Sequence, residues 1–203
     1  MTDTLFIAPD IFGHTPALDR LAEKIAGRTR PGKIKIIDPY DMDSYGNRRF
    51  FRREEAAYDY FKAWSGIPEY SRRISDKVNR ETNPVALVGF SAGASAIWHL
   101  SGEDNTPPVS CALGFYGSQI RHYPDIVPGF PVHLIFPDYE PHFDVDVLAR
   151  AISSTPKVSC EKAPGRHGFM NEYSRNFDPE LYQSYVLLPS FSTGWESLQN
   201  NLI

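Results

Sequence analysis

The feature that most constrains this chain is an apolar run that leads straight into a glycine-flanked serine. Four apolar residues, Val85 to Val88, precede Gly89-Phe90-Ser91-Ala92-Gly93, and helix-forming sequence follows as far as Leu100. Small residues two positions before and after a serine allow a tight turn that leaves the hydroxyl exposed at its tip. The pattern predicts a strand, a sharp turn and a helix, with Ser91 as a nucleophile; the alternative is a serine that only caps the helix.

The length and composition favour a single domain that spans residues 1–203. A chain of 203 residues can bury one sizeable core, and little would remain for a second. No stretch approaches the roughly 20 apolar residues that cross a bilayer, and the N-terminus lacks the basic and apolar regions of a secretory signal. The sequence therefore predicts a cytoplasmic protein with no membrane partner, as a monomer or a homodimer.

Charge and cysteine content argue against several other classes of protein. A formal net charge of -4 disfavours nucleic acid as a partner, although Arg48, Arg49, Arg52 and Arg53 form a local basic cluster. We interpret that cluster as part of a solvated surface loop. The cysteines, at positions 111 and 160, lie in apolar strand-like runs and fit buried reduced thiols better than a disulfide or a metal site. We expect neither a metal nor an organic cofactor.

Strand-like and helical patterns alternate along the chain. This alternation predicts an α/β fold, with a compact, mostly parallel sheet covered by helices on both faces. The predicted strands cover residues 5–8, 33–37, 85–88, 109–115, 132–136 and 157–161. The predicted helices cover residues 17–26, 54–80 with a break near 66–68, 92–100, 143–153 and the segment after Asp178, where Pro179 follows an N-cap.

Loops at the carboxyl ends of parallel strands carry the functional site in such folds, so we searched there for a base that serves Ser91. A serine hydroxyl is a poor nucleophile at neutral pH and needs a base within hydrogen-bond reach. His167 follows the last predicted strand and lies between Gly165 and Gly168, in a loop able to present its ring toward the sheet. His142 is the second choice. The sequence therefore predicts His167 as the general base.

A carboxylate should orient the histidine, and several follow the fifth predicted strand. Asp138, Glu140 and Asp144 all qualify by position. Asp138 also suits a turn cap, and Asp144 suits the first turn of a helix. We prefer Glu140 because it stands clear of the strand end, and because of the family comparison below. In chain order the predicted residues are then a serine, an acid and a histidine.

Backbone donors must stabilise an oxyanion that forms beside Ser91. The residue after the nucleophile is Ala92, whose N–H begins the predicted helix. A second N–H is expected from the loop after the first strand, at Ile11 or its neighbour. Aromatic residues near this edge could line an apolar pocket: Phe12, Tyr40, Phe50, Phe51, Tyr116 and Phe169.

Together these segments resemble the dienelactone hydrolase family of α/β-hydrolases. The likeness runs from about residue 5 to residue 190 and implies the α/β-hydrolase fold, with Ser91, Glu140 and His167 as a catalytic triad. We predict Asp10, Phe12, Tyr116 and Phe169 as substrate-binding residues. The matching segments are Ala8-Pro9-Asp10-Ile11-Phe12-Gly13, Ile37-Asp38-Pro39-Tyr40, Gly89-Phe90-Ser91-Ala92-Gly93, Gly114-Phe115-Tyr116-Gly117 and Gly165-Arg166-His167-Gly168-Phe169.

Several residues depart from the family's pattern. Ser91 replaces the cysteine of the founding enzymes, Glu140 replaces an aspartate, and Asp10 replaces a loop glutamate that contacts the resting nucleophile. The family arginine that holds a substrate carboxylate would fall at Asn171, which cannot replace a cation. The resemblance therefore implies a different ester or lactone from dienelactone.

The first functional hypothesis is a serine hydrolase of a small carboxylic ester, thioester or lactone, with that small molecule as its partner. A second is a member of the fold that binds a small molecule without catalysis, since fold does not determine function. A third is an acyltransferase that uses the same residues.

Overall fold

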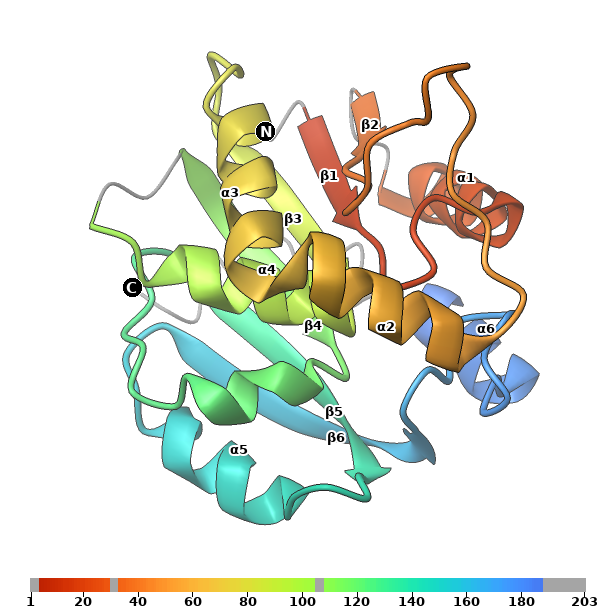
Figure 1. The fold of residues 1–203 in the computed structure, drawn as a ribbon. Helices are drawn as coiled ribbons and strands as arrows, with labels where there is room; N and C mark the ends of the chain where they lie inside the picture. Colours follow the sequence, from red (N-terminus) through yellow and green to blue (C-terminus); the bar gives the residue numbers. More distant parts are fainter. Residues whose placement is uncertain (1–3, 30–32, 105–107, 188–203) are drawn as a thin grey trace.

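The structure, a computed structural model, describes residues 4–29, 33–104 and 108–187. Within them one sheet of six parallel strands has the order β2-β1-β3-β4-β5-β6 (Figure 1). The strands are β1 (Thr4–Ala8), β2 (Lys33–Ile36), β3 (Val85–Phe90), β4 (Val109–Phe115), β5 (Val132–Tyr139) and β6 (Val158–Arg166). The predicted parallel sheet is confirmed. The predicted domain's ends, 1–3 and 188–203, lie outside the described residues.

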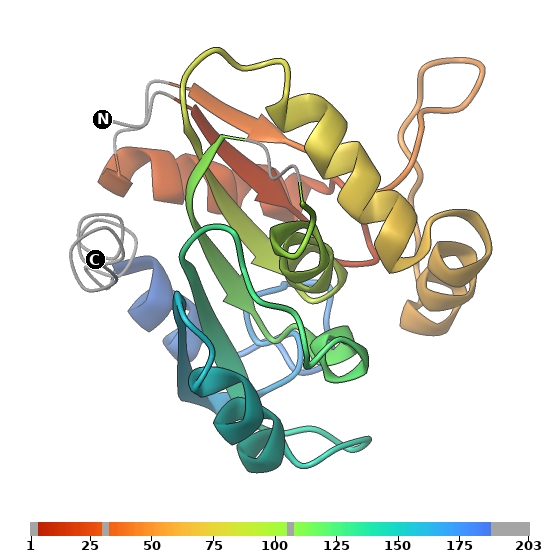
Figure 2. The same ribbon diagram turned by 90° about the vertical axis from the view of Figure 1, so that its left-hand side faces the viewer.

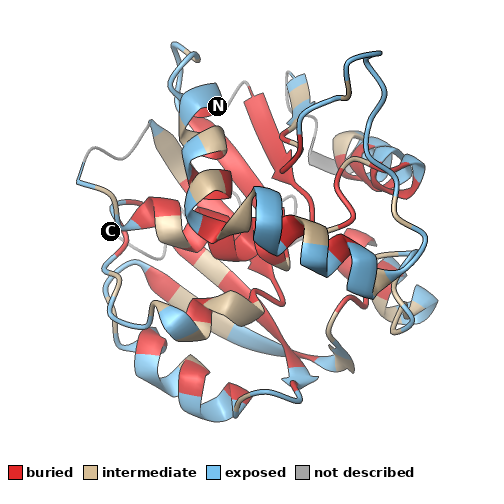
Figure 3. Ribbon diagram, viewed as in Figure 1, coloured by how far each residue is buried: buried red, intermediate tan, exposed pale blue. Residues whose placement is uncertain are grey.

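The inner strands are buried on both faces. Every residue of β1 and β3 is buried, whereas the edge strand β2 alternates between exposed and half-buried positions. A parallel sheet covered on both sides needs continuous apolar strands rather than alternating ones. The run Val85 to Val88 therefore forms a central strand, and its residues separate two layers of core (Figure 3).

Helices cover both faces of the sheet (Figure 2). On one face, α1 (Pro16–Thr29) and α6 (Pro179–Leu187) enclose an apolar cluster that includes Ile25 and Tyr185. On the other face, α3 (Gly66–Val78), α4 (Ala92–Ser101) and α5 (Val145–Ser153) enclose a second cluster around Trp98. The remaining helical elements are α2 (Glu54–Trp64) and the short 3₁₀ helix η1 (Ser118–His122).

The helix ends follow the chemistry that the sequence indicates. The predicted break between α2 and α3 falls at Ser65, because Pro68 lies in the first turn of α3, where its missing N–H has no intrahelical partner. Asp178 caps α6 as predicted: its Oδ1 accepts hydrogen bonds from the N–H groups of Glu180 and Leu181, at 3.0 and 2.9 Å. No helix among the described residues is both long and apolar enough for a membrane crossing.

The last strand is longer than the sequence predicts. The apolar pattern predicts a strand over residues 157–161. The structure continues β6 to Arg166. Since β6 is an edge strand with one pairing partner, β5, a proline can be accommodated there. Both cysteines are free; Cys111 is buried and Cys160 is half-buried.

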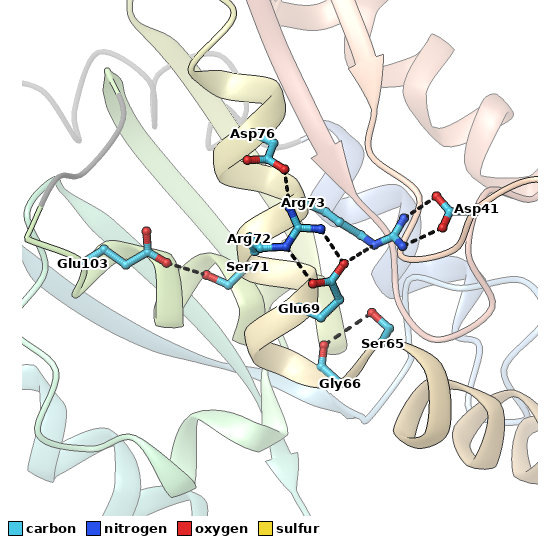
Figure 4. Close-up of polar contacts among 9 residues, drawn as sticks. All are labelled: Asp41, Ser65, Gly66, Glu69, Ser71, Arg72, Arg73, Asp76 and Glu103. Carbon is cyan, nitrogen blue, oxygen red and sulfur yellow. Dashed lines mark hydrogen bonds and ion pairs between the residues drawn. The ribbon is translucent and has the colours of Figure 1, made fainter.

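A loop of mostly exposed residues joins β2 to α2, and ion pairs anchor its start to α3 (Figure 4). The guanidinium of Arg73 donates to both carboxylate oxygens of Asp41, at 2.7 and 2.8 Å, and to Glu69 at 3.1 Å. Arg72 pairs with Glu69 and with Asp76 on the same helix. The bidentate contact of Arg73 therefore holds the loop where it leaves the sheet edge.

Candidate active site

Ser91 occupies a sharp turn between β3 and α4. Its φ of 50° and ψ of -107° lie in a region that residues other than glycine rarely adopt. A Cβ at Gly89 would lie 2.6 Å from the backbone N of Ala94, and one at Gly93 would lie 2.1 Å from the carbonyl O of Ala8. Only glycine fits at these two positions. The close approach of Gly93 also brings the turn against the end of β1.

The side chains of Ser91, His167 and Glu140 form a continuous hydrogen-bonded chain. Ser91 Oγ lies 2.8 Å from His167 Nε2, and His167 Nδ1 lies 2.6 Å from Glu140 Oε1. When the Nδ1–H donates to the carboxylate, Nε2 is left as the acceptor for the serine hydroxyl. The Glu140 side chain is 4% exposed and that of His167 is 25% exposed. The carboxylate is thus shielded from water, while the imidazole remains open to a bound molecule.

The register between β5 and β6 explains why Glu140 and His167 meet. The pairing passes from Pro137 with Ala163 to Tyr139 with Arg166, so β6 contributes one more residue than β5 over this stretch. Such a bulge bends the strand and changes the direction of the side chains that follow it. Because Tyr139 pairs with Arg166 at the ends of the two strands, the residue after Tyr139 lies beside the residue after Arg166. Those residues are Glu140 and His167.

The alternative acid and base residues from the sequence have other contacts. Asp138 is exposed and lies 3.6 Å from the amino group of Lys162. Asp144 caps α5 by accepting the N–H of Val147 at 3.1 Å. His142 is exposed on the turn before α5. Of the predicted candidates, the structure therefore brings only Glu140 and His167 to Ser91.

The backbone N–H groups of Ile11 and Ala92 have no hydrogen-bond acceptor within the described part of the chain. Ala92 is the first residue of α4, where an unpaired N–H is expected. The positive end of the α4 dipole lies at the same place and favours negative charge beside Ser91. Ile11 lies in the loop after β1, which Gly93 contacts through Ala8 and Pro9. The role of these two N–H groups in binding an oxyanion stays a prediction.

Asp10 is a buried residue of the loop after β1, and it forms hydrogen bonds within that loop and with the loop that follows β6. Its carboxylate accepts the backbone N–H of Phe12 at 3.0 Å and the side-chain amide of Asn171 at 2.5 Å. Burial raises the pKa of Asp10, and the bonds from Phe12 and Asn171 and the nearby His167 partly offset this. No hydrogen bond joins Asp10 to Ser91 among the described residues. Asp10 thus links two loops, and a contact with substrate stays a prediction.

The other residues predicted to touch substrate are largely enclosed. Tyr116 and Phe169 are fully buried, and the Tyr116 ring centroid lies 5.1 Å from that of the His167 imidazole. Phe12 is 6% exposed and stacks on Tyr173 at 6.3 Å. Tyr116 therefore supports the histidine from within the core, and Phe169 packs against Tyr116 with ring centroids 5.2 Å apart. Their contact with a substrate stays a prediction, as it does for Phe12.

Two asparagines hold the histidine loop: sequence reasoning missed Asn176, and it singled out Asn171 only as the position of a family arginine. Asn176 donates its side-chain amide to the carbonyl O of His167 at 2.9 Å, and Asn171 donates to Asp10. Neither position carries a local sequence signal, because an asparagine in a loop is typical of any turn. Among the described residues, no group of three or more His, Cys, Asp or Glu side chains is arranged to hold a metal.

The fold and the order of the site residues define an α/β-hydrolase-fold protein. Similar solved structures include mouse alpha/beta hydrolase domain-containing protein 10, with a TM-score of 0.62, 10% identity, and 92% and 87% of the two chains covered. A dienelactone hydrolase from Anabaena variabilis has a TM-score of 0.61, 14% identity, and 95% and 86% coverage. At these identities the likeness shows the fold, and it confirms the resemblance drawn from the sequence at that level.

A sequence relative places the chain more closely. It is 31% identical over 149 residues to the uncharacterized protein YczH of Bacillus subtilis strain 168, across 72% of this chain and 71% of YczH. The chain belongs to the same family as YczH. No protein-family model matches it.

Proposed function

We propose that this protein is a serine hydrolase that acts on a small carboxylic ester, thioester or lactone. The observation that supports it most is the hydrogen-bonded chain from Ser91 Oγ through the imidazole of His167 to the Glu140 carboxylate, at 2.8 and 2.6 Å. These are the contacts that a base-activated serine requires. They occur on a strained turn at the carboxyl ends of the strands, where α/β folds hold their ligands.

In the acylation step, Ser91 Oγ attacks the carbonyl carbon while its proton passes to Nε2 of His167. The carbonyl oxygen becomes an oxyanion, which accepts hydrogen bonds from the N–H groups of Ile11 and Ala92. The Glu140 carboxylate stabilises the positive imidazolium through Nδ1–H. The tetrahedral intermediate then collapses, the bond to the leaving oxygen or sulfur breaks, and His167 returns its proton to that atom. An acyl group remains on Ser91.

Deacylation repeats these steps with water as the nucleophile. Water gives a proton to Nε2 of His167 as its oxygen attacks the acyl carbonyl, and the same two N–H groups stabilise the second oxyanion. Collapse breaks the bond between the acyl carbon and Ser91 Oγ, which takes the proton back from His167. The carboxylic acid leaves and the resting enzyme is restored.

The names of similar solved structures also support an ester or thioester as the class of substrate. Besides the dienelactone hydrolase, they include a dienelactone hydrolase-like promiscuous phosphotriesterase, P91, and a thioesterase domain from the curacin biosynthetic pathway. Their TM-scores are 0.61 and 0.57. Those names describe those proteins, and what they share with this chain is the fold.

The test combines labelling of Ser91 with a substrate screen. A fluorophosphonate should label Ser91 in the native protein, identified by peptide mass spectrometry, and should not label heat-unfolded protein or Ser91→Ala. A series of p-nitrophenyl esters, thioesters and simple lactones should be hydrolysed by wild type and not by Ser91→Ala. A native protein that neither labels nor turns over any of these substrates would contradict the proposal and favour a binding role.

The same screen separates hydrolysis from acyl transfer. Added alcohols or amines at millimolar concentration should leave the carboxylic acid as the main product, because water is the acyl acceptor. If an alcohol or amine instead takes most of the acyl group, the protein is an acyltransferase that uses the same residues.

A further inference from the structure

The loop that presents the Ile11 N–H is held by a set of hydrogen bonds. The Gly13 N–H donates to the Asp10 carbonyl O at 3.0 Å, and the Phe12 N–H donates to Asp10 Oδ1 at 3.0 Å. The phenol of Tyr40, from the loop after β2, donates to the Ile11 carbonyl O at 2.6 Å. Two of these bonds lie within the loop, whereas the bond from Tyr40 comes from another part of the chain.

These bonds orient the two peptide groups of the turn. In a trans peptide the C=O and N–H point in opposite directions, so the bond to the Asp10 carbonyl also directs the Ile11 N–H. The next peptide is held at both ends, because Tyr40 binds the Ile11 C=O and Asp10 binds the Phe12 N–H. The Ile11 N–H itself has no acceptor among the described residues. The turn therefore points one free donor in a fixed direction.

Tyr40 is itself firmly placed. It is 7% exposed, and its backbone N–H donates to Asp38 Oδ1 at 2.9 Å. Its ring packs edge-on against Tyr60 and Phe51, with centroids 5.3 and 5.5 Å away. The next residue, Asp41, is held by Arg73 (Figure 4). Burial and the nearby carboxylates of Asp10 and Asp38 raise the pKa of the Tyr40 phenol well above its ordinary range, so it remains a donor.

A second buried phenol holds the residue before the turn. Tyr70, on α3, has its Oη 3.0 Å from the carbonyl O of Pro9 and 2.9 Å from that of Ile37. The single phenol proton is shared between these two acceptors in a bifurcated hydrogen bond. Tyr70 therefore joins the chain after β1 to the chain after β2, which leads directly into Tyr40. Tyr70 thus ties the Pro9 end of the Pro9–Gly13 segment to the chain after β2, and Tyr40, from that same part of the chain, binds the Ile11 carbonyl.

We propose that Tyr40 is a positioning residue for the oxyanion: its phenol holds the peptide that follows Ile11, and so, through the Ile11 Cα, helps the Gly13–Asp10 bond to keep the Ile11 N–H in place before substrate arrives. This inference rests on the proposed function, since it assigns a role in the same reaction. Tyr40 does not touch the substrate and acts only through Ile11. A donor fixed in advance stabilises charge in the transition state without reorganising during the reaction.

The test compares Tyr40→Phe with Tyr60→Phe, which removes a hydroxyl from the adjacent ring without touching Ile11. Both variants keep the aromatic packing. Loss of a whole oxyanion donor lowers kcat by roughly 10²–10³-fold, so loss of its positioning should lower kcat by about 10-fold. KM for the best p-nitrophenyl ester should stay nearly unchanged. Tyr60→Phe should match wild type in both.

A transition-state analogue supplies the second readout. A trifluoromethyl ketone with the same acyl chain forms a hemiketal oxyanion on Ser91, and its Ki should rise in Tyr40→Phe by the same factor as kcat falls. Because Ki and KM do not depend on the concentration of folded enzyme, partial unfolding cannot produce this pattern.

The outcomes separate this inference from the proposed function. An active wild type in which Tyr40→Phe leaves kcat and Ki unchanged, or in which Tyr60→Phe causes equal losses, would overturn the role of Tyr40 alone. A wild type with no turnover beyond that of Ser91→Ala would overturn both.

Discussion

The side-chain amide of Asn171 donates to Asp10 Oδ2 at 2.5 Å and so joins loops that are 161 residues apart in the sequence. One loop carries His167, and the other carries Ile11. Asn171 occupies the position at which the dienelactone hydrolase family is expected to hold a substrate carboxylate with arginine. In this chain the position binds a buried carboxylate of the protein itself.

This pair predicts a preference for uncharged acyl groups. Glu54, whose charge acts on Asp10, places negative charge beside the site, and Asn171 offers no cation to a substrate carboxylate. The kcat/KM for p-nitrophenyl butyrate should exceed that for mono-p-nitrophenyl glutarate at pH 7 by about tenfold, as expected for weak repulsion between partly screened charges. Steady-state kinetics at low and high salt measure this ratio of kcat/KM values, which should fall toward one as the salt concentration increases. Equal values for the two esters would contradict the prediction.

Replacement of the orienting acid should remove most turnover without removing the fold. Glu140→Gln leaves an amide that cannot stabilise the imidazolium, so kcat should fall by roughly 10²–10⁴-fold. Asp138→Asn serves as the matched control, because Asp138 lies at the end of the same strand but faces Lys162. It should keep kcat within about twofold, since it loses only an exposed ion pair. Comparable losses in the two variants would mean that Glu140 has no special role.

The sequence predicts the order of the site residues, but the structure is needed to choose among the acids. Glycine spacing around Ser91 is a local signal, because Gly89 and Gly93 are required by contacts within one strand–turn–helix unit and its neighbour β1. The choice of Glu140 over Asp138 depends on the pairing of Tyr139 with Arg166 and on a bulge in β6. Register between distant strands is a tertiary property, and local patterns do not encode it.

For the same reason, the sequence does not predict the contacts between loops at the site. The contacts of Asn171 with Asp10 and of Tyr40 with Ile11 join different loops at the edge of the sheet. Each side chain is unremarkable in its own segment, and its role follows only from where the sheet order places its loop. The fold class was predictable because six strands carry strong apolar patterns, whereas the contacts between loops were not.

Gly93 should be essential for the turn that carries Ser91. A methyl group there would lie 2.1 Å from the carbonyl O of Ala8, so Gly93→Ala must push α4 away from β1. We expect a loss of about 3 kcal/mol or more in the free energy of unfolding, measured by urea denaturation. Gly27→Ala, in α1, is the control: nothing lies within 4 Å of its added methyl group. It should stabilise the protein by up to about 1 kcal/mol, because alanine favours helix. A native-like Gly93→Ala would show that the close approach is not required.

The contact between Arg73 and Asp41 predicts how stability depends on pH. Arg73 lowers the pKa of Asp41 below its ordinary value of 3.8. A carboxyl group whose pKa is lowered in the folded state stabilises the fold above its unfolded pKa, and this contribution disappears as the pH falls through the folded pKa. Arg73→Gln should therefore lower the free energy of unfolding at pH 7 by at most about 1 kcal/mol, since Asp41 is largely exposed. The difference from wild type should shrink toward zero below about pH 3.

Urea denaturation from pH 7 down to pH 2 measures this difference, and Arg80→Gln controls for the loss of one positive charge. Arg80 is exposed just beyond the end of α3, and Asp41 has its hydrogen bonds with Arg73 instead. The Arg80 variant should therefore follow the wild-type pH dependence. If the Arg73 variant is destabilised by the same amount at every pH, the side chain, which is 21% exposed, acts through the packing of its alkyl part rather than through its charge. In that case the anchor of the loop that carries Tyr40 would be apolar, and protonation of Asp41 would leave the loop in place.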